Sequence, residues 1–175
     1  MIDPSGNHFE LFGLPATFRI DADALDDAYR ALQAEVHPDR HAGGSDTDRR
    51  VALQSSTRVN EAYQALKDPI ERARYLLALR GIDAFDETDT KLSLAFLESQ
   101  LERREKAAHA ADVDDIRALD AILAEVRGEM HKRQLELAAL LDDASAVDRA
   151  KAAVRELRFL AKVAEDVGAM LASLD

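Results

Sequence analysis

The chain contains no cysteine, which excludes disulfide bonds and thiolate metal sites. It is also poor in residues that interrupt helices, with 7 glycines and 4 prolines among 175 residues. The long stretches between them are rich in alanine, leucine, glutamate and arginine, all of which favour helix. A hydrophobic share of 47% is sufficient for a packed core. We therefore expect an almost entirely helical, folded protein.

Several classes of partner are disfavoured by what else the sequence lacks. No apolar run approaches the length that crosses a membrane, and residues 1–5 have neither signal-peptide nor transit-peptide character. The net charge of −11 comes from 34 acidic and 23 basic residues, and no basic cluster offsets it. An acidic surface repels the phosphate backbone of nucleic acids. We expect a cytoplasmic protein that binds neither nucleic acid nor membrane.

The first half of the chain predicts a helical hairpin. Apolar residues recur at three- and four-residue steps over residues 21–36 and again over residues 46–67, which indicates two amphipathic helices. A one- or two-turn helix is expected before them, within residues 9–14. A further helix, capped by Asp68 with Pro69 at its first position, is expected to reach Arg80, where Gly81 ends it.

The loop between the two long helices begins with His37-Pro38-Asp39. Pro38 fixes its own φ and disfavours the helical conformation at His37, so the first helix must end there. The resulting short polar tip suits docking to another protein. Catalysis by His37 and Asp39 would need a nucleophile and a substrate pocket, and the local sequence offers neither. We expect no enzymatic activity and no cofactor.

The second half predicts a three-helix bundle. A polar connector over residues 81–90 precedes helical patterns over residues 89–110, 112–141 and 146–174. Asp112 with Asp115 is expected to cap the second of these helices, and Ser145 with Asp148 the third. Short connections between long amphipathic helices imply antiparallel neighbours. The expected fold class is all-α, with a helical hairpin followed by a bundle over residues 91–175.

Some apolar residues of the second half do not fit the core stripes neatly. On the first long helix, Leu97 and Leu101 lie on one side. Charged residues crowd the same side of it, namely Glu102, Arg104 and Glu105. In the third helix, Phe159 lies beside the apolar seam. Large apolar side chains mixed with charges are typical of a partner site, whereas the alternative is that these residues are ordinary core. The pattern alone leaves both interpretations open.

The motifs of the first half resemble those of a J-domain, the module by which DnaJ-type co-chaperones stimulate ATP hydrolysis by heat-shock-class chaperones. The resemblance, over residues 7–80, lies in the order of Phe12-Gly13-Leu14-Pro15, His37-Pro38-Asp39, Asn60-Glu61-Ala62-Tyr63, Asp68-Pro69, Arg72 and Tyr75. It implies that His37, Pro38 and Asp39 dock on the chaperone ATPase. J-domains usually carry several basic residues on the helix before the loop. This chain has Arg30 there and Arg40 after the tip, and these are the basic contacts we expect.

The whole chain from Phe9 onward is similar to the HscB family of co-chaperones of iron–sulfur cluster assembly. In the second half the similarity lies in Ala95-Phe96-Leu97, Gln100-Leu101-Glu102, Arg104-Glu105 and Leu157-Arg158-Phe159-Leu160. It implies two partners, an HscA-type chaperone ATPase and an IscU-type scaffold protein. The scaffold-binding residues that it implies are Leu97, Leu101, Glu102, Arg104, Glu105 and Phe159. The chain departs from the family at Glu98, where an apolar residue is familiar.

Two other interpretations stay open at this point. One is a J-domain co-chaperone whose bundle binds a different client. The other is a purely structural or oligomerising helical protein in which His37-Pro38-Asp39 is incidental.

Overall fold

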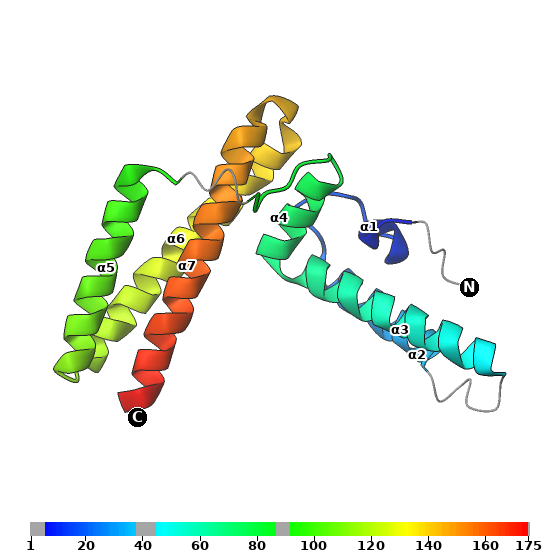
Figure 1. Cartoon of the computed structure of the whole chain (residues 1–175), viewed down its shortest axis with the longest axis horizontal. Helices are drawn as coiled ribbons and strands as arrows, with labels where there is room; N and C mark the ends of the chain where they lie inside the picture. The colour runs from blue at the N-terminus through cyan, green and yellow to red at the C-terminus, as the bar shows by residue number, and fades with distance from the viewer. Residues whose placement is uncertain (1–5, 38–44, 87–91, 175) are drawn as a thin grey trace. The chain divides into compact units, whose positions relative to one another are not determined.

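The computed structural model describes residues 6–37, 45–86 and 92–174, and in these ranges the regular structure is helical throughout (Figure 1). The predicted all-α class is therefore confirmed. The chain divides into two compact units, Met1–Leu79 and Arg80–Asp175. Each unit has its own buried core and is described separately.

The first unit is built on a helical hairpin. Helix α1 (His8–Leu11) precedes α2 (Ala22–Val36), α3 (Asp46–Lys67) and α4 (Pro69–Ala78), and α3 packs against each of the other three. Polar side chains satisfy the free amides at the helix starts, as the sequence predicts for Asp68, which accepts hydrogen bonds from the amides of Ile70 and Glu71. The cap of α3 is Ser45, which forms a reciprocal pair with Asp48.

The hairpin is held by both apolar and polar contacts between α2 and α3. Fully buried side chains fill the space between the helices of this unit: Phe9, Leu25, Val59, Leu66 and Leu77. Beside this core the Tyr29 and Tyr63 rings stack with their centroids 3.9 Å apart. The Tyr63 hydroxyl donates to Asp26 (2.8 Å), and the Tyr29 hydroxyl donates to Asn60 (2.9 Å). These bonds fix the register of one helix against the other.

The second unit is a three-helix bundle. Helices α6 (Ile116–Asp142) and α7 (Val147–Leu174) form a long antiparallel pair, joined by the 3₁₀ turn η2 (Ala144–Ala146), and α5 (Leu94–Asp112) packs against both (Figure 1). The α6–α7 seam is strongly apolar. Its fully buried side chains are Leu119, Val126, Leu137, Leu157 and Leu160.

Several predicted helix boundaries are wrong. Helix α4 ends at Ala78, before Arg80, although Gly81 does adopt the positive φ expected after a helix end. Helix α5 begins at Leu94, capped by Ser93, and not at residue 89. Near the start of α5 the sequence offers more than one polar side chain that could serve as the N-cap, and the pattern does not say which one is used.

The starts of α6 and α7 show the same ambiguity. Asp112 belongs to the end of α5, and Asp115 alone caps α6. Between them Asp114 adopts a φ of +54°, a left-handed conformation that breaks the helix. At the start of α7, Asp143 accepts from the Ser145 amide (2.8 Å), so Ser145 lies inside η2 and does not cap the helix.

Helix α5 buries a face other than its leucine stripe. Its buried residues are Phe96, Gln100, Ala107 and Ala110. Gln100 is only 1% exposed, and its amide oxygen accepts from Arg103 (2.5 Å), which pairs in turn with Glu129 of α6 (2.8 Å). The buried face is thus narrow and partly polar. Periodicity located the apolar stripe of this helix but not the direction in which it points.

His8 makes the stability of the first unit depend on pH. Its ring stacks on Tyr75 at 4.0 Å, and burial lowers its pKa below the ordinary value near 6.5, helped by the charge of Arg58 and opposed by Glu61. The folded chain therefore binds this proton at lower pH than the unfolded chain. The contribution of His8 to stability is complete above about pH 6.5 and is lost as the pH falls from there through the lowered pKa of the folded chain.

The test is thermal denaturation of the full chain between about pH 7.5 and 5.5, followed by circular dichroism. The substitution His8→Phe keeps a stacking ring and removes the titration. We expect its Tm to fall less on acidification than that of the unmodified chain, by about 2–4 °C at most because His8 is only half-buried. The exposed His131 offers a matched control, and His131→Gln should keep the original pH dependence. Identical pH profiles for all three proteins would contradict the assignment.

Candidate functional site

The tip of the helical hairpin begins where the sequence predicts. Helix α2 ends at Val36, which is buried, and His37 is its C-cap with φ −57° and ψ 128°. This extended conformation is the one that a following proline favours. The His37 side chain is exposed. Pro38, Asp39 and Arg40 lie outside the described residues, so the predicted tip site is represented in the structure by His37 alone.

Arg30, the predicted basic contact of α2, already has an acidic partner. Its guanidinium pairs with Asp27 one turn earlier on the exposed face, and this hydrogen bond raises the pKa of Arg30. The neighbouring carboxylate, Asp26, accepts from Tyr63 and lies 3.8 Å from the ammonium of Lys67. Lys67 is exposed near the C-terminal end of α3 and is a cation of this surface that the sequence interpretation missed. The outer surface of the hairpin therefore carries paired charges of both signs.

The predicted residues of α5 lie together on its exposed face. Leu97 is 40% exposed and Leu101 is 60% exposed, so neither is a core residue. Leu94, which the sequence analysis did not count as a site residue, is 71% exposed. It stands seven residues, nearly two turns, before Leu101 on the same side of the helix. We call Leu94, Leu97 and Leu101 the leucine strip. The seven-residue spacing between Leu94 and Leu101 was the signal in the sequence that could have placed Leu94 in this site.

Charged side chains border the leucine strip. Glu102 pairs with Lys106 at 3.0 Å, and both side chains are well exposed. Arg104 reaches across to α7, where it pairs with Asp166 at 3.4 Å. Glu105 is exposed on α5. A surface that combines exposed leucines with charges of both signs has the composition of a protein-binding patch.

Phe159 connects this patch to the core. Its ring packs edge-on against Phe96, with the centroids 5.7 Å apart, and the Arg104 guanidinium lies 5.5 Å from its centroid. Phe159 is half-buried against the core of the bundle. The structure thus brings Phe159 and Arg104 together from α7 and α5. Phe159 has both structural contacts and an accessible surface, whereas the leucine strip is essentially exposed.

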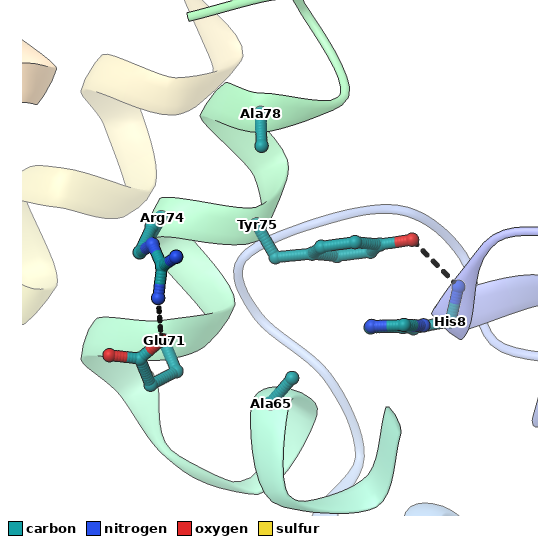
Figure 2. Close-up of a pocket in the computed structure, with 6 residues that line it drawn as sticks. All are labelled: His8, Ala65, Glu71, Arg74, Tyr75 and Ala78. Atoms are coloured by element: carbon teal, nitrogen blue, oxygen red, sulfur yellow. Dashed lines mark hydrogen bonds and ion pairs between the residues drawn. The ribbon is translucent and has the colours of Figure 1, made fainter. Parts of the chain in front are cut away.

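A small pocket in the first unit lacks a nucleophile that could act in catalysis. Its volume is about 200 Å³ and its lining is His8, Ala65, Glu71, Arg74, Tyr75 and Ala78 (Figure 2). The Tyr75 hydroxyl accepts from the His8 backbone amide (3.0 Å), and Arg74 pairs with Glu71 (2.8 Å), as Figure 2 shows. The lining contains no serine, threonine or cysteine that could act as a nucleophile.

In residues 6–37, 45–86 and 92–174, no three His, Asp or Glu side chains gather as metal ligands would. Across the same ranges, no helix is both long and apolar enough to cross a bilayer.

Comparison with known proteins covers both units. The DnaJ domain model matches residues 7–75, and the model of the HSCB C-terminal oligomerisation domain matches residues 92–168. The "Co-chaperone protein HscB homolog" of Burkholderia mallei (strain SAVP1) is 47% identical over 175 residues, which cover 100% of this chain and 99% of the relative.

Two solved structures share the fold closely. The chaperone HscB from Vibrio cholerae has a TM-score of 0.87 at 36% identity, covering 97% of this chain and 100% of its own. The human co-chaperone protein HscB also has a TM-score of 0.87, at 29% identity, covering 95% of this chain and 82% of its own. These relatives are named as chaperones and co-chaperones and not as enzymes, in agreement with the expectation of a non-enzymatic protein.

The resemblance recognised in the motifs is therefore confirmed along the whole chain, and the fold combines a J-domain hairpin with a C-terminal three-helix bundle. This chain belongs to the HscB family of J-domain co-chaperones.

Proposed function

We propose that this protein is a cytoplasmic adaptor of iron–sulfur cluster assembly. Its J-domain stimulates the ATPase of a dedicated HscA-type chaperone, and its bundle delivers an IscU-type scaffold protein to that chaperone. The observation that carries the proposal is the exposure of Leu97 and Leu101 on α5 in a chain of the HscB family. The protein itself supplies no catalytic group.

The leucine strip supports the scaffold-binding half of the proposal. Exposed leucines gain free energy only when a partner removes them from water, at roughly 25 cal/mol for each Å² buried. Helix α5 keeps its leucines outside while it buries Gln100, so the chain leaves apolar surface in water that its own core does not use. Glu102, Arg104 and Glu105 then supply a polar rim around an apolar centre. We assign Phe159 to the same site because it contacts Arg104.

The chaperone-binding half rests on the tip of the hairpin. His37 is exposed at the end of α2, and the family resemblance assigns it to the chaperone contact together with Pro38, Asp39, Arg30 and Arg40. Because Arg30 is already paired with Asp27, it adds little net positive charge to this surface. Complementary charge acts mainly on the association rate, so we expect a slow and salt-insensitive encounter that relies on the tip itself.

Joining two binding units in one chain raises the effective concentration of the scaffold at the chaperone. We assign residues 7–80 to the chaperone-binding domain, 81–90 to a connector and 91–175 to the scaffold-binding bundle. A scaffold held by the bundle is delivered at a high local concentration to a chaperone held by the J-domain. Neither affinity has to be high for this to work. An alternative is a different client on the same bundle, and the binding experiments below separate the two.

The substitution His37→Gln tests the assignment of the tip. We expect it to abolish stimulation of the purified chaperone's ATPase, because the imidazole is exposed at the docking site, and to leave the affinity for the scaffold unchanged. The measurement is steady-state ATP hydrolysis by the chaperone with increasing co-chaperone. His131→Gln, an exposed histidine of α6, is the control and should stimulate like the unmodified chain. Full stimulation by His37→Gln would rule out the proposed role.

Substitution of the strip tests scaffold binding separately from folding. We expect Leu97→Ala and Leu101→Ala each to weaken binding at least about tenfold, or about 1.4 kcal/mol, while changing the unfolding free energy by no more than about 0.5 kcal/mol. Phe159→Ala should weaken binding and also lower stability, since it packs on Phe96. The fully buried Leu160 is the control, and Leu160→Ala should lose about 2–5 kcal/mol of stability.

These affinities are measured by titration calorimetry with a purified IscU-type scaffold, and the stabilities by chemical denaturation. A large loss of stability in Leu97→Ala or Leu101→Ala would identify these leucines as core. Absence of any binding by the unmodified chain would favour a different client.

A further inference from the structure

Glu98 borders the leucine strip. Helix geometry places it one turn after Leu94, about 40° around the helix axis from Leu94 and about 60° from Leu101, on the edge of the strip opposite Leu97. Glu98 is exposed, and among the described residues it has neither an ion pair nor a hydrogen bond from its side chain. A partner that packs closely on Leu94 and Leu101 therefore also approaches an unpaired negative charge.

The neighbouring charges of α5 do not neutralise it. Glu102 is paired with Lys106, and Arg104 is paired with Asp166, so both cations of this surface are already engaged. Glu105, one turn beyond Leu101, is a second exposed carboxylate without a partner in the described part of the chain. Glu98 and Glu105 thus flank Leu101 with two uncompensated negative charges on the same side of the helix.

Burial of such a charge is unfavourable unless a counter-charge accompanies it. Removing a carboxylate from water costs several kcal/mol, which exceeds the gain from covering one leucine side chain. A wholly apolar partner surface that covered this edge of the strip would consequently be disfavoured. A surface with a lysine or arginine opposite Glu98 would instead form a partly desolvated ion pair beside the leucines.

We propose that Glu98 is a specificity-determining residue of the scaffold site, where it forms an ion pair with a lysine or arginine of the scaffold. Leu94 extends the apolar contact by one turn and supplies apolar contact area that the charged Glu98 does not. This inference rests on the proposed function. The occupant is the IscU-type scaffold, with an apolar patch that has at least one cationic side chain beside it. The charge at Glu98 restricts binding to scaffolds that carry this cation and disfavours scaffolds that lack it.

Three variants test the charge by calorimetry with the purified scaffold, at low and at high salt. Glu98→Gln should weaken binding about three- to tenfold at low salt, and the difference should shrink at high salt, because the ion pair is screened. Glu98→Leu should weaken binding as well, since it would leave the scaffold's cation against a leucine. The control is Glu125→Gln, an exposed glutamate of α6 outside the strip, which should bind like the unmodified chain.

Leu94→Ala tests the extension of the strip. We expect about tenfold weaker binding that does not depend on salt, with the Tm unchanged because Leu94 is 71% exposed. Leu135 of α6, which is 51% exposed, provides the matched control, and Leu135→Ala should leave binding unaffected.

The outcomes separate this inference from the proposed function. Tighter binding by Glu98→Leu, or equal affinity of Glu98→Gln and the unmodified chain at both salt concentrations, overturns the ion pair while scaffold binding stands. Unchanged affinity of Leu94→Ala overturns the extended strip. If the unmodified chain does not bind the scaffold at all, the proposed function fails.

Discussion

The second unit depends on the apolar seam between α6 and α7. Leu119, Val126 and Leu137 on one helix and Leu157 and Leu160 on the other are fully buried. Because this pair supplies most of the apolar burial, the third helix does not need to contribute large side chains. Helix α5 is free to pack through Phe96, a glutamine and small alanines. Its leucines can then face water, and that freedom is the structural origin of the candidate binding surface.

The same reasoning explains how far the sequence could predict this unit. Periodicity identified three helices, and the short connections identified their antiparallel arrangement. Periodicity could not predict which side of α5 is buried, because an apolar stripe that packs on the core has the same spacing as one that binds a partner. The burial of Gln100 was invisible as well, because its hydrogen bonds to Arg103 and its neighbour Ser99 exist only once the helix is folded. The starts of α6 and α7 were predicted wrongly because more than one neighbouring polar residue could cap each helix.

In the first unit, many motif residues that carry the family resemblance are packing residues. Asn60 and Tyr63 hold α2 against α3 through Tyr29 and Asp26.

Arg72 donates to the carbonyl of Leu66 (2.7 Å), one of the free carbonyls at the end of α3. Burial lowers the pKa of Arg72, and its guanidinium also lies over the Phe18 ring at 5.1 Å. A motif of this kind is therefore a reliable guide to the fold, and among its residues we propose a direct functional role only for His37 and its two neighbours. The site residues of α5 could be named from resemblance, but their exposure required coordinates.

The polar contact between α5 and α6 has a consequence for binding. Arg103 is largely buried, is oriented by Gln100 of its own helix and pairs with Glu129 of α6, so a shift of α5 by one turn, about 5.4 Å, would separate the guanidinium from the Glu129 carboxylate. An apolar contact would tolerate such a displacement far better. The axial position and rotation of α5 are thereby fixed in the folded chain. For the binding role that we propose for α5, the entropic penalty of ordering the helix is then met during folding and not during association.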